Sequence, residues 1–332
     1  MLSGRAWLLV KFGDPMEGVR LQETTWDQPA PGRVLVRVRA AGAGHGDAWM
    51  TSGAYPFFSG EPPFGLGAEA AGEVVAVAPG SRFAVGDQVA GYAAVLEGPG
   101  GYADYAYLDE GMAFRIPAGM TDEEAAGFPI GFRTAYAGLV ERTPVERGQT
   151  LLVLGAAGAI GGTALQLGKA LGATVIGVAG GREKTDFALR HGADHVVDHR
   201  TEDLTARIAG ITGGRGVDLI YDPVGGDMGA TAVKSLARGG RIAIVGQASG
   251  TTTPLDSGDM MMRGHSAVGV LGFPHEDPEQ EASVWEHLRR LAERGAIRTP
   301  VGKVHTLEDV PRMIAGQIAP PAGKSVVRVA SA

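Results

Sequence analysis

The segment 151–161, with the sequence LLVLGAAGAIG, constrains the fold of this chain more than any other stretch. Its first four residues are apolar and predict a buried strand, and a helical pattern begins at about Ile160. A strand-to-helix turn without bulky side chains lets a diphosphate approach the backbone, where the helix N-terminus offers N–H groups and the positive end of its dipole. The segment therefore predicts a dinucleotide site of the Rossmann type.

Residues 156–161 fall in the register of the pattern G-x-G-x-x-G, with alanine in place of the first glycine. We expect the backbone at Ala157, Gly158, Ala159 and Ile160 to bind the cofactor diphosphate, because these residues form the end of the turn and the start of the helix. The pattern by itself is a weak signal, so the assignment depends on the segments that follow it.

The second strand, expected at 174–179, ends without the carboxylate that NAD-dependent enzymes usually place there for the ribose hydroxyls. Instead, two glycines lead into Arg182, and Lys184 follows closely. Space and positive charge suit a 2′-phosphate, so the sequence favours NADPH over NADH, with Gly181, Arg182 and Lys184 as binding residues. Alternatively, both cations are solvated residues in the first turn of a helix, where Glu183 is also favourable.

Length and composition indicate an ordinary globular protein of two domains, with 332 residues, of which 44% are hydrophobic and 20% charged. The net charge of −7 and the lack of long basic runs argue against nucleic acid or an anionic membrane as the main partner. The chain has no cysteine, which excludes disulfides, thiolate catalysis and a zinc site built on cysteine. The apolar run near the N-terminus is shorter than a signal-peptide core, and we expect a cytoplasmic protein without a membrane span.

A change of pattern near residue 121 separates two kinds of structure. Before it, short alternating or apolar runs predict a β-rich unit with strands near 34–39, 73–78, 88–92 and 100–108. Thr121 and Glu124 are spaced as a capping box, which opens a helix. Strands and helices then alternate, and several helices are followed by glycine, which predicts a doubly wound parallel sheet. The expected strands lie near 151–154, 174–179, 195–198, 217–221, 241–245 and 266–270, and the helices near 160–171, 182–190, 202–211 and 227–237, with Gly172, Gly192, Gly213 and Gly239 as closing glycines.

The C-terminal part predicts two helices, near 278–294 and 307–317, and a last strand at 325–329. This strand has no other strand nearby in the sequence with which to pair. We therefore expect it to return to the β-rich unit formed by the first hundred residues.

Further short motifs stand in a fixed order along the chain. Together with the turn at 156–161 they resemble the medium-chain dehydrogenase/reductase superfamily and, within it, the NADPH:quinone oxidoreductase branch of zeta-crystallin-like proteins. The resemblance covers nearly all of the sequence. It implies a homodimer and an α/β fold, with a GroES-like catalytic domain (1–122 and 269–332) around a Rossmann NADPH-binding domain (123–268). The motifs are GD at 46–47, GAYP at 53–56, GLGAEAAG at 65–72, VGDQV at 85–89, GYA at 101–103, TAY at 134–136, GAD at 192–194, TGGRGVD at 212–218, DPVGG at 222–226 and GGR at 239–241.

Zinc alcohol dehydrogenases share this architecture and are the nearest alternative family. Their catalytic zinc requires a cysteine near position 44, a histidine near position 68 and a further cysteine or acid. This chain has Gly44, Ala68 and no cysteine, so a borderline-soft metal finds no set of thiolate and imidazole ligands. We therefore expect a zinc-independent enzyme with no metal site.

The resemblance makes three residues candidates for the catalytic site. Tyr55 corresponds to a residue at the mouth of the substrate cleft, where a phenol ring stacks on a planar quinone and its hydroxyl donates a hydrogen bond; packing on Pro56 and Phe57 is the alternative. His45 lies in the loop that faces the cofactor, either as a hydrogen-bond or proton donor or as a solvated residue. Thr134 matches a position close to the nicotinamide ring.

The resemblance also assigns cofactor contacts after the third and fifth strands. His199 is expected near the adenosine, and it is followed by Arg200 in a pair that relatives often place near the 2′-phosphate. The backbone of Gly246 and Gln247 is expected to border the nicotinamide ribose, at the sheet edge where cofactors bind.

Further residues are expected near the site. Leu271 and Phe273 follow the sixth strand and are expected to hold the carboxamide and ring of the nicotinamide. Arg133 meets the substrate or a phosphate, is solvated, or pairs with Glu141. We expect Asp47 to brace its loop through backbone N–H groups instead of acting as a catalyst.

These features predict hydride transfer from NADPH to a quinone, which gives a hydroquinone anion that water can protonate. An alternative is reduction of an enone or enoyl thioester, whose α-carbon needs a proton from Tyr55, His45 or water. Two further alternatives are NADPH binding with negligible turnover and a zinc-type alcohol dehydrogenase that has lost its ligands.

Overall fold

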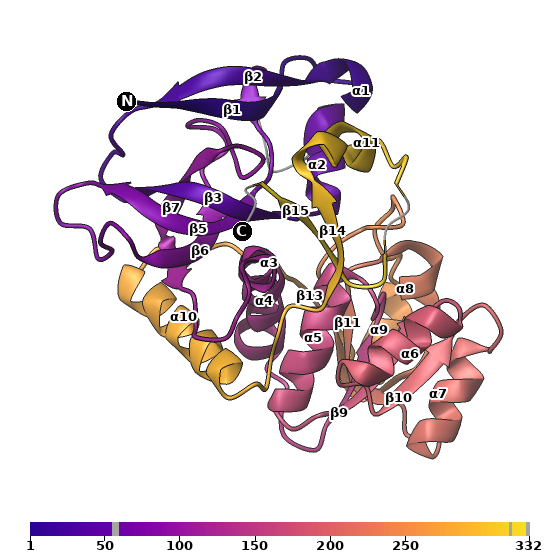
Figure 1. Cartoon of the computed structure of the whole chain (residues 1–332). Coiled ribbons are helices and arrows are strands. Elements are labelled where there is room, and N and C mark those ends of the chain that lie inside the picture. Colours follow the sequence, from indigo (N-terminus) through magenta and orange to yellow (C-terminus); the bar gives the residue numbers. More distant parts are fainter. Residues whose placement is uncertain (55–59, 319–320, 330–332) are drawn as a thin grey trace. The chain divides into compact units, whose positions relative to one another are not determined.

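A computed structural model describes residues 1–54, 60–318 and 321–329 of the chain (Figure 1). The chain divides into two units. The first consists of Met1–Ile130, Pro274–Glu293 and Val301–Ala332, and the second consists of Gly131–Phe273 and Arg294–Pro300. The expected domain boundaries after residues 122 and 268 stay a prediction.

The second unit is built on a six-stranded parallel sheet with the order β10-β9-β8-β11-β12-β13. Counted from β8, this is the order 3-2-1-4-5-6 of a doubly wound dinucleotide-binding sheet, and it confirms the predicted fold class. The order reverses between β8 and β11, so the loops after these strands flank the switch point at the carboxyl edge. The strands are β8 (Thr150–Val153), β9 (Thr174–Ala179), β10 (His195–Asp198), β11 (Val217–Asp222), β12 (Leu236–Ile244) and β13 (Ser266–Gly269).

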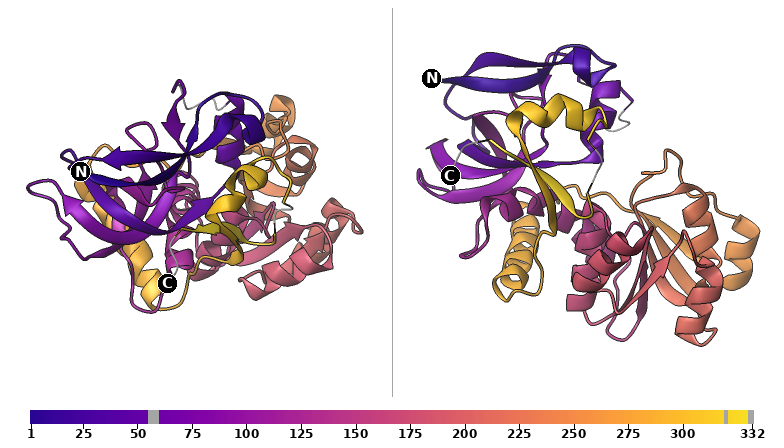
Figure 2. Two further views of the ribbon diagram at one scale, coloured as in Figure 1. Left: turned by 45° about the horizontal axis from the view of Figure 1, so that its top comes forward. Right: turned by 45° about the vertical axis from the view of Figure 1, so that its right-hand side comes forward.

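Helices cover both faces of this sheet. The helices α5 and α6 pack on one face and α7 and α8 on the other, as the right-hand view of Figure 2 shows. No helix in the described part of the chain is long and apolar enough to cross a membrane. The helices are α4 (Phe128–Tyr136), which leads into the unit, the π-helix η1 (Ala137–Arg142), α5 (Ala159–Ala170), α6 (Arg182–Arg190), α7 (Leu204–Thr212), α8 (Gly226–Val233) and α9 (Ser257–Arg263).

The prediction of a helix near 227–237 is wrong at its C-terminal end. It stops at Val233, and Leu236 already pairs with Val217 as the first residue of β12. Gly239, with a φ of 76°, lies inside this strand at an irregularity between the pairs formed by Leu236 and Arg241, so it does not close a helix. Burial of Leu236 in the core beside the sheet outweighs the helical pattern.

The first unit contains one six-stranded sheet, β14-β15-β3-β5-β6-β7, and one three-stranded sheet, β2-β1-β4. The long strand β3 pairs with β5 for most of its length, with β7 through residues 33–37 and with β15 through residues 40–43. The last strand of the chain therefore returns to the β-rich unit, which confirms the prediction. The strands are β1 (Leu2–Leu9), β2 (Val19–Trp26), β3 (Arg33–Ala43), β4 (Phe64–Gly65), β5 (Glu69–Val77), β6 (Gln88–Ala93), β7 (Tyr105–Arg115), β14 (Val301–Thr306) and β15 (Lys324–Arg328).

The sequence does not predict β1, β2 and β14, because most side chains of β2 and β14 are exposed and the apolar alternation is weak. It also places the start of β7 too early, at Gly100 instead of Tyr105. A Cβ atom on Gly100 would lie 2.4 Å from the carbonyl oxygen of Leu66, so the glycines here form a closely packed loop.

Short helices complete the first unit. The predicted capping box is confirmed at α3, where the Thr121 hydroxyl accepts from the Glu124 N–H (3.2 Å) and the Glu124 carboxylate accepts from the Thr121 N–H (3.0 Å). The helix expected at 307–317 is shorter and starts as a 3-10 turn. The helices are α1 (Pro15–Gly18), α2 (His45–Ser52), α3 (Asp122–Ala126), α10 (Pro278–Glu293), the 3-10 turn η2 (Leu307–Asp309) and α11 (Val310–Ile314).

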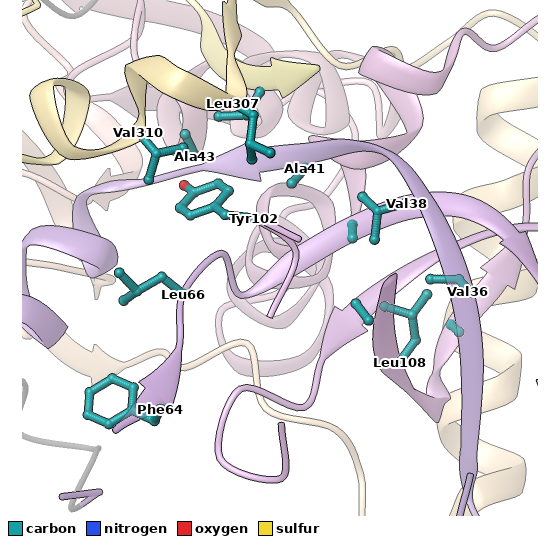
Figure 3. Packing of buried hydrophobic residues seen from close by; sticks show 14 of the residues in the cluster. Val36, Val38, Ala41, Ala43, Phe64, Leu66, Tyr102, Leu108, Leu307 and Val310 are labelled. Carbon is teal, nitrogen blue, oxygen red and sulfur yellow. The ribbon is translucent and has the colours of Figure 1, made fainter. Parts of the chain in front are cut away.

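The apolar core of the first unit joins the two ends of the chain. Leu307 and Val310, from the C-terminal segment, lie beside Tyr102 and Ala43 in Figure 3. All four side chains are buried. Ala43, which precedes α2, and Met50, on α2, both belong to this core, so the core fixes the helix that His45 begins.

Candidate active site

The predicted phosphate-binding turn is the entry to α5. Gly158 is the N-cap of this helix, and within the described residues no side chain caps it. The first turn contains no acidic residue, since Ala159 and Ile160 begin the helix. The first N–H groups of a helix have no partner inside the helix, so this end offers hydrogen-bond donors and a positive dipole to an anion.

Close backbone packing explains two glycines of the turn. Gly155 has a φ of 58°, which favours glycine, and a Cβ atom on Gly161 would lie 2.2 Å from the Gly155 carbonyl oxygen. Ala156, which the motif aligns with a glycine, is fully buried and donates its N–H to Val178 (3.0 Å). The turn thus needs a glycine at Gly155, one position before the motif begins. In the sequence this position is marked by the end of the apolar run 151–154.

At the carboxyl end of β9, two side chains from the turn after β10 cover a glycine. A Cβ atom on Gly180 would lie 2.7 Å from His199 Nε2 and 2.9 Å from Arg200 Nε. Asp198 Oδ1 accepts the N–H of Gly181 (2.9 Å) and that of Arg200 (3.1 Å), which ties the two loops together. These hydrogen bonds hold the pKa of Asp198 below its ordinary value, and the bond from Gly181 has the largest effect. The carboxylate is therefore a charged anchor for the loops.

The cations at this edge differ in their surroundings. The Arg182 side chain is 95% exposed and lies 3.7 Å from Asp186, one helical turn further on. Lys184 is half-buried, and neither Lys184 nor Arg200 forms an ion pair with any residue that the structure describes. Arg200 is thus a free cation beside Gly180 and a stronger candidate for a phosphate contact than Arg182. The sequence signal for it is the His–Arg pair after the third strand.

The loop after β12 lies on the loop after β11. Gly246 donates its N–H to the Asp222 carbonyl oxygen (3.2 Å), and a Cβ atom on Gly246 would lie 2.9 Å from the Pro223 carbonyl oxygen. Gln247 is half-buried next to it. Both predicted residues therefore lie at the carboxyl edge of the sheet, as a cofactor contact requires.

Thr134 on α4 is in contact with the segment after β13. A Cβ atom on Gly272 would lie 2.5 Å from Thr134 Oγ1, so this loop approaches the helix closely. Its neighbours Leu271 and Phe273 are 39% and 59% exposed. The structure thus brings three of the predicted residues into one patch of the second unit.

Arg133, next to Thr134, is buried and does not point into solvent. Its guanidinium lies 3.2 Å from the Glu141 carboxylate. This pairing agrees with one of the alternatives considered for Arg133.

His45 and Tyr55 belong to the first unit. His45 is the first residue of α2 and is exposed, and its ring meets the edge of Trp49 with centroids 5.2 Å apart. Tyr55 lies outside the described residues. The catalytic roles of both residues stay predictions.

Asp47 braces its loop, as predicted. Its carboxylate accepts the N–H groups of Gly44 (3.0 Å) and Gly67 (3.3 Å) and the hydroxyl of Tyr102 (2.8 Å). Burial raises the pKa of Asp47, and the hydrogen bonds and the nearby Lys324 oppose that rise. The side chain is therefore a structural support for the loop that begins α2.

A buried ion pair lies next to this loop and is not predicted from the sequence. Lys324 on β15 pairs with Glu69 on β5, and both side chains are buried. Glu69 also accepts the N–H of Ile130 (2.9 Å). The partners are far apart in the chain, and the pairing of β3 with both β15 and β5 brings them together.

Metal-ligating side chains do not gather in the described residues, where no group of three or more His, Asp and Glu could hold a metal ion. The chain has no cysteine, and positions 44 and 68 are glycine and alanine. A zinc site with cysteine ligands is therefore excluded by the sequence itself.

Two family models match the two parts of the chain. The family described as "Alcohol dehydrogenase GroES-like domain" matches residues 30–118, and that described as "Zinc-binding dehydrogenase" matches residues 159–288. The first match agrees with the GroES-like fold expected for the β-rich unit.

Two relatives that match most of the chain are both quinone oxidoreductases. The chain is 36% identical over 290 residues to a quinone oxidoreductase of Pseudomonas aeruginosa, covering 86% of this chain and 87% of that protein. It is 30% identical over 312 residues to a quinone oxidoreductase of Homo sapiens, covering 92% and 91%. The structure of Escherichia coli quinone oxidoreductase complexed with NADPH is 29% identical and has a TM-score of 0.87, covering 98% of this chain and 100% of that chain.

Proposed function

Because the chain belongs to the quinone oxidoreductase branch of the medium-chain dehydrogenase/reductase superfamily, we propose that it is an NADPH-dependent enzyme that reduces a quinone. The observation that carries the cofactor part is the end of β9, where Arg200 and His199 cover Gly180 and the two residues that directly follow the strand are glycines. A ribose 2′-phosphate needs such a cation, whereas a free 2′-hydroxyl needs an acceptor.

The residues present fit NADPH at two points. The N-terminus of α5 from Ala157 to Ile160 would hold the diphosphate through backbone N–H groups. Arg200 and Lys184, with the backbone of Gly181, would hold the 2′-phosphate. The contacts assigned to Arg182, His199, Gly246, Gln247, Leu271 and Phe273 are proposals of the same kind.

Bound NADPH would supply a hydride, and the protein supplies alignment and exclusion of water. Thr134 and the loop with Leu271 and Phe273 form a partly apolar patch that would orient the flat nicotinamide ring. A quinone that accepts the hydride becomes a hydroquinone anion, which takes its proton from solvent. The reaction therefore needs no dedicated protein acid, and a metal is not required to activate the carbonyl.

Steady-state kinetics with a panel of quinones test this proposal. We expect oxidation of NADPH at 340 nm in the presence of simple benzoquinones and naphthoquinones, with kcat/KM at least about tenfold higher for NADPH than for NADH, since one charge-assisted hydrogen bond is worth ~1.5 kcal/mol or more. Binding of NADPH without turnover on any quinone would leave a binding protein, and equal use of both cofactors would overturn the 2′-phosphate assignment. A homodimer and a cytoplasmic location stay predictions.

A further inference from the structure

The carboxylate of Asp222, at the end of β11, is completely buried. Its Oδ1 accepts the N–H groups of Val224 and Gly225, each at 2.8 Å, and its Oδ2 accepts the hydroxyl of Thr253. Among the described residues no cation pairs with it. Burying a carboxylate is costly unless hydrogen bonds satisfy it, and here all three donors come from loops at the carboxyl edge of the sheet.

These donors belong to two loops that are joined along their length. The loop pair consists of residues 222–226, after β11, and residues 245–253, after β12. Backbone hydrogen bonds run from Val245 to Asp222 (2.9 Å), from Ala248 to Pro223 (3.2 Å) and from Ser249 to Val224 (2.9 Å). The hydrogen bond from the Thr253 hydroxyl to Asp222 joins the last residue of the second loop to the first residue of the first loop.

Glycines allow the two loops to approach this closely. A Cβ atom on Gly225 would lie 2.3 Å from the Thr251 carbonyl oxygen. A Cβ atom on Gly229 would lie 2.2 Å from Thr253 Oγ1 and 2.6 Å from Asp222 Oδ2. Glycine at these two positions therefore leaves the space that the Asp222–Thr253 hydrogen bond requires. A larger residue at either position would displace the partners of this bond.

The loop pair lies against the phosphate-binding turn. A Cβ atom on Gly155 would lie 3.0 Å from Val224 Cγ2, so the first loop packs directly on the turn. The Cα atom of Gln247 is 3.4 Å from a Cβ atom placed on Gly225, so the second loop is held by the first. The position of Gln247 therefore depends on the conformation that Asp222 imposes.

We propose that Asp222 and Thr253 are positioning residues for the nicotinamide half of the cofactor. They fix the loop pair so that Val224, Gly246 and Gln247 border the switch point in one conformation. The adenosine half is held by other residues, at the ends of β9 and β10, and does not depend on this bond. This inference rests on the proposed function, since it assumes that NADPH binds at the carboxyl edge.

The test compares Thr253→Val, which removes the hydroxyl but keeps the shape, with Thr253→Ser, which keeps the hydroxyl. Thr252→Val is a matched control, because Thr252 is the exposed neighbour. Affinities for NADPH and for 2′,5′-ADP, which lacks the nicotinamide half, are measured by calorimetry below the melting temperature of every variant. Steady-state kcat with a benzoquinone is measured beside them.

We expect Thr253→Val to raise the Kd for NADPH about tenfold, which corresponds to the free energy of one hydrogen bond to a charged group. We also expect it to lower kcat by up to about 100-fold, because the nicotinamide ring would be misplaced. Its affinity for 2′,5′-ADP should equal that of the wild type, and Thr253→Ser and Thr252→Val should behave as the wild type. If the valine variant does not fold, Thr253→Ala takes its place.

Two results would overturn the inference. One is wild-type NADPH affinity and kcat in Thr253→Val, which would make the bond a matter of stability alone. The other is an equal loss for NADPH and 2′,5′-ADP, which would show a general loosening of the second unit. Failure of the proposed function looks different, because the wild-type protein itself would then either not bind NADPH or not reduce any quinone.

Discussion

Replacement of Arg200 by alanine should lower the affinity for NADPH and leave the affinity for NADH unchanged. The guanidinium lies next to Gly180 at the end of β9 and forms no ion pair with the described residues, so its charge is available to a 2′-phosphate. Arg182, the cation that the sequence favours, is instead almost fully exposed and near Asp186. The structure therefore ranks Arg200 above Arg182.

The size of the effect follows from the exposure of the site. A hydrogen bond to a charged group contributes ~1.5–3 kcal/mol, which corresponds to about 10- to 150-fold in Kd. Because Arg200 is exposed, water screens the interaction and the low end applies. We therefore expect about a tenfold rise in the Kd for NADPH and a smaller rise for Arg182→Ala.

Calorimetric titration of each variant with NADPH and with NADH measures this difference. Arg290→Ala is the control, because it removes the same charge from the first unit, where Arg290 pairs with Glu286 on an exposed helix face. An unchanged NADPH affinity in Arg200→Ala, or an equal loss for both cofactors, would refute the assignment.

Three further predictions concern the turn, the buried pair and metals. Gly161→Ala places a Cβ atom 2.2 Å from the Gly155 oxygen, so urea titration should show a loss of ~1–3 kcal/mol and NADPH binding should fail, while Gly158→Ala, at 3.2 Å, should be milder in both assays. Lys324→Met leaves the Glu69 carboxylate buried without its cation and should cost ~3–5 kcal/mol in the free energy of unfolding; a loss below 1 kcal/mol would contradict the pairing. Prolonged dialysis against EDTA should leave quinone reduction intact, and restoration of lost activity by zinc would disprove metal independence.

Local patterns predict the second unit well because its elements are regular. Apolar runs place the six parallel strands, and their alternation with helices fixes the sheet type. The predictions fail where tertiary packing decides. Leu236 joins a strand because its side chain is buried, and β2 and β14 are missed because their exposed faces carry no apolar alternation.

The site shows the same division. The turn at 151–161 and the lack of an acid directly after β9 are local signals. The first predicts the diphosphate site, and the second predicts NADPH instead of NADH. The bond between Asp222 and Thr253 and the pair of Glu69 with Lys324 join residues that only the sheet topology brings together. A single sequence contains no periodicity that reports such contacts, so they become visible only in the structure.

A crystal structure of the protein with NADPH tests the central claim most directly. The account predicts the diphosphate at the N-terminus of α5, in hydrogen-bond contact with backbone N–H groups between Ala157 and Ile160. It also predicts the 2′-phosphate over Gly180, within hydrogen-bond distance of the Arg200 guanidinium. A complex at saturating NADPH with the diphosphate away from α5, or with the 2′-phosphate turned away from Arg200, would contradict it.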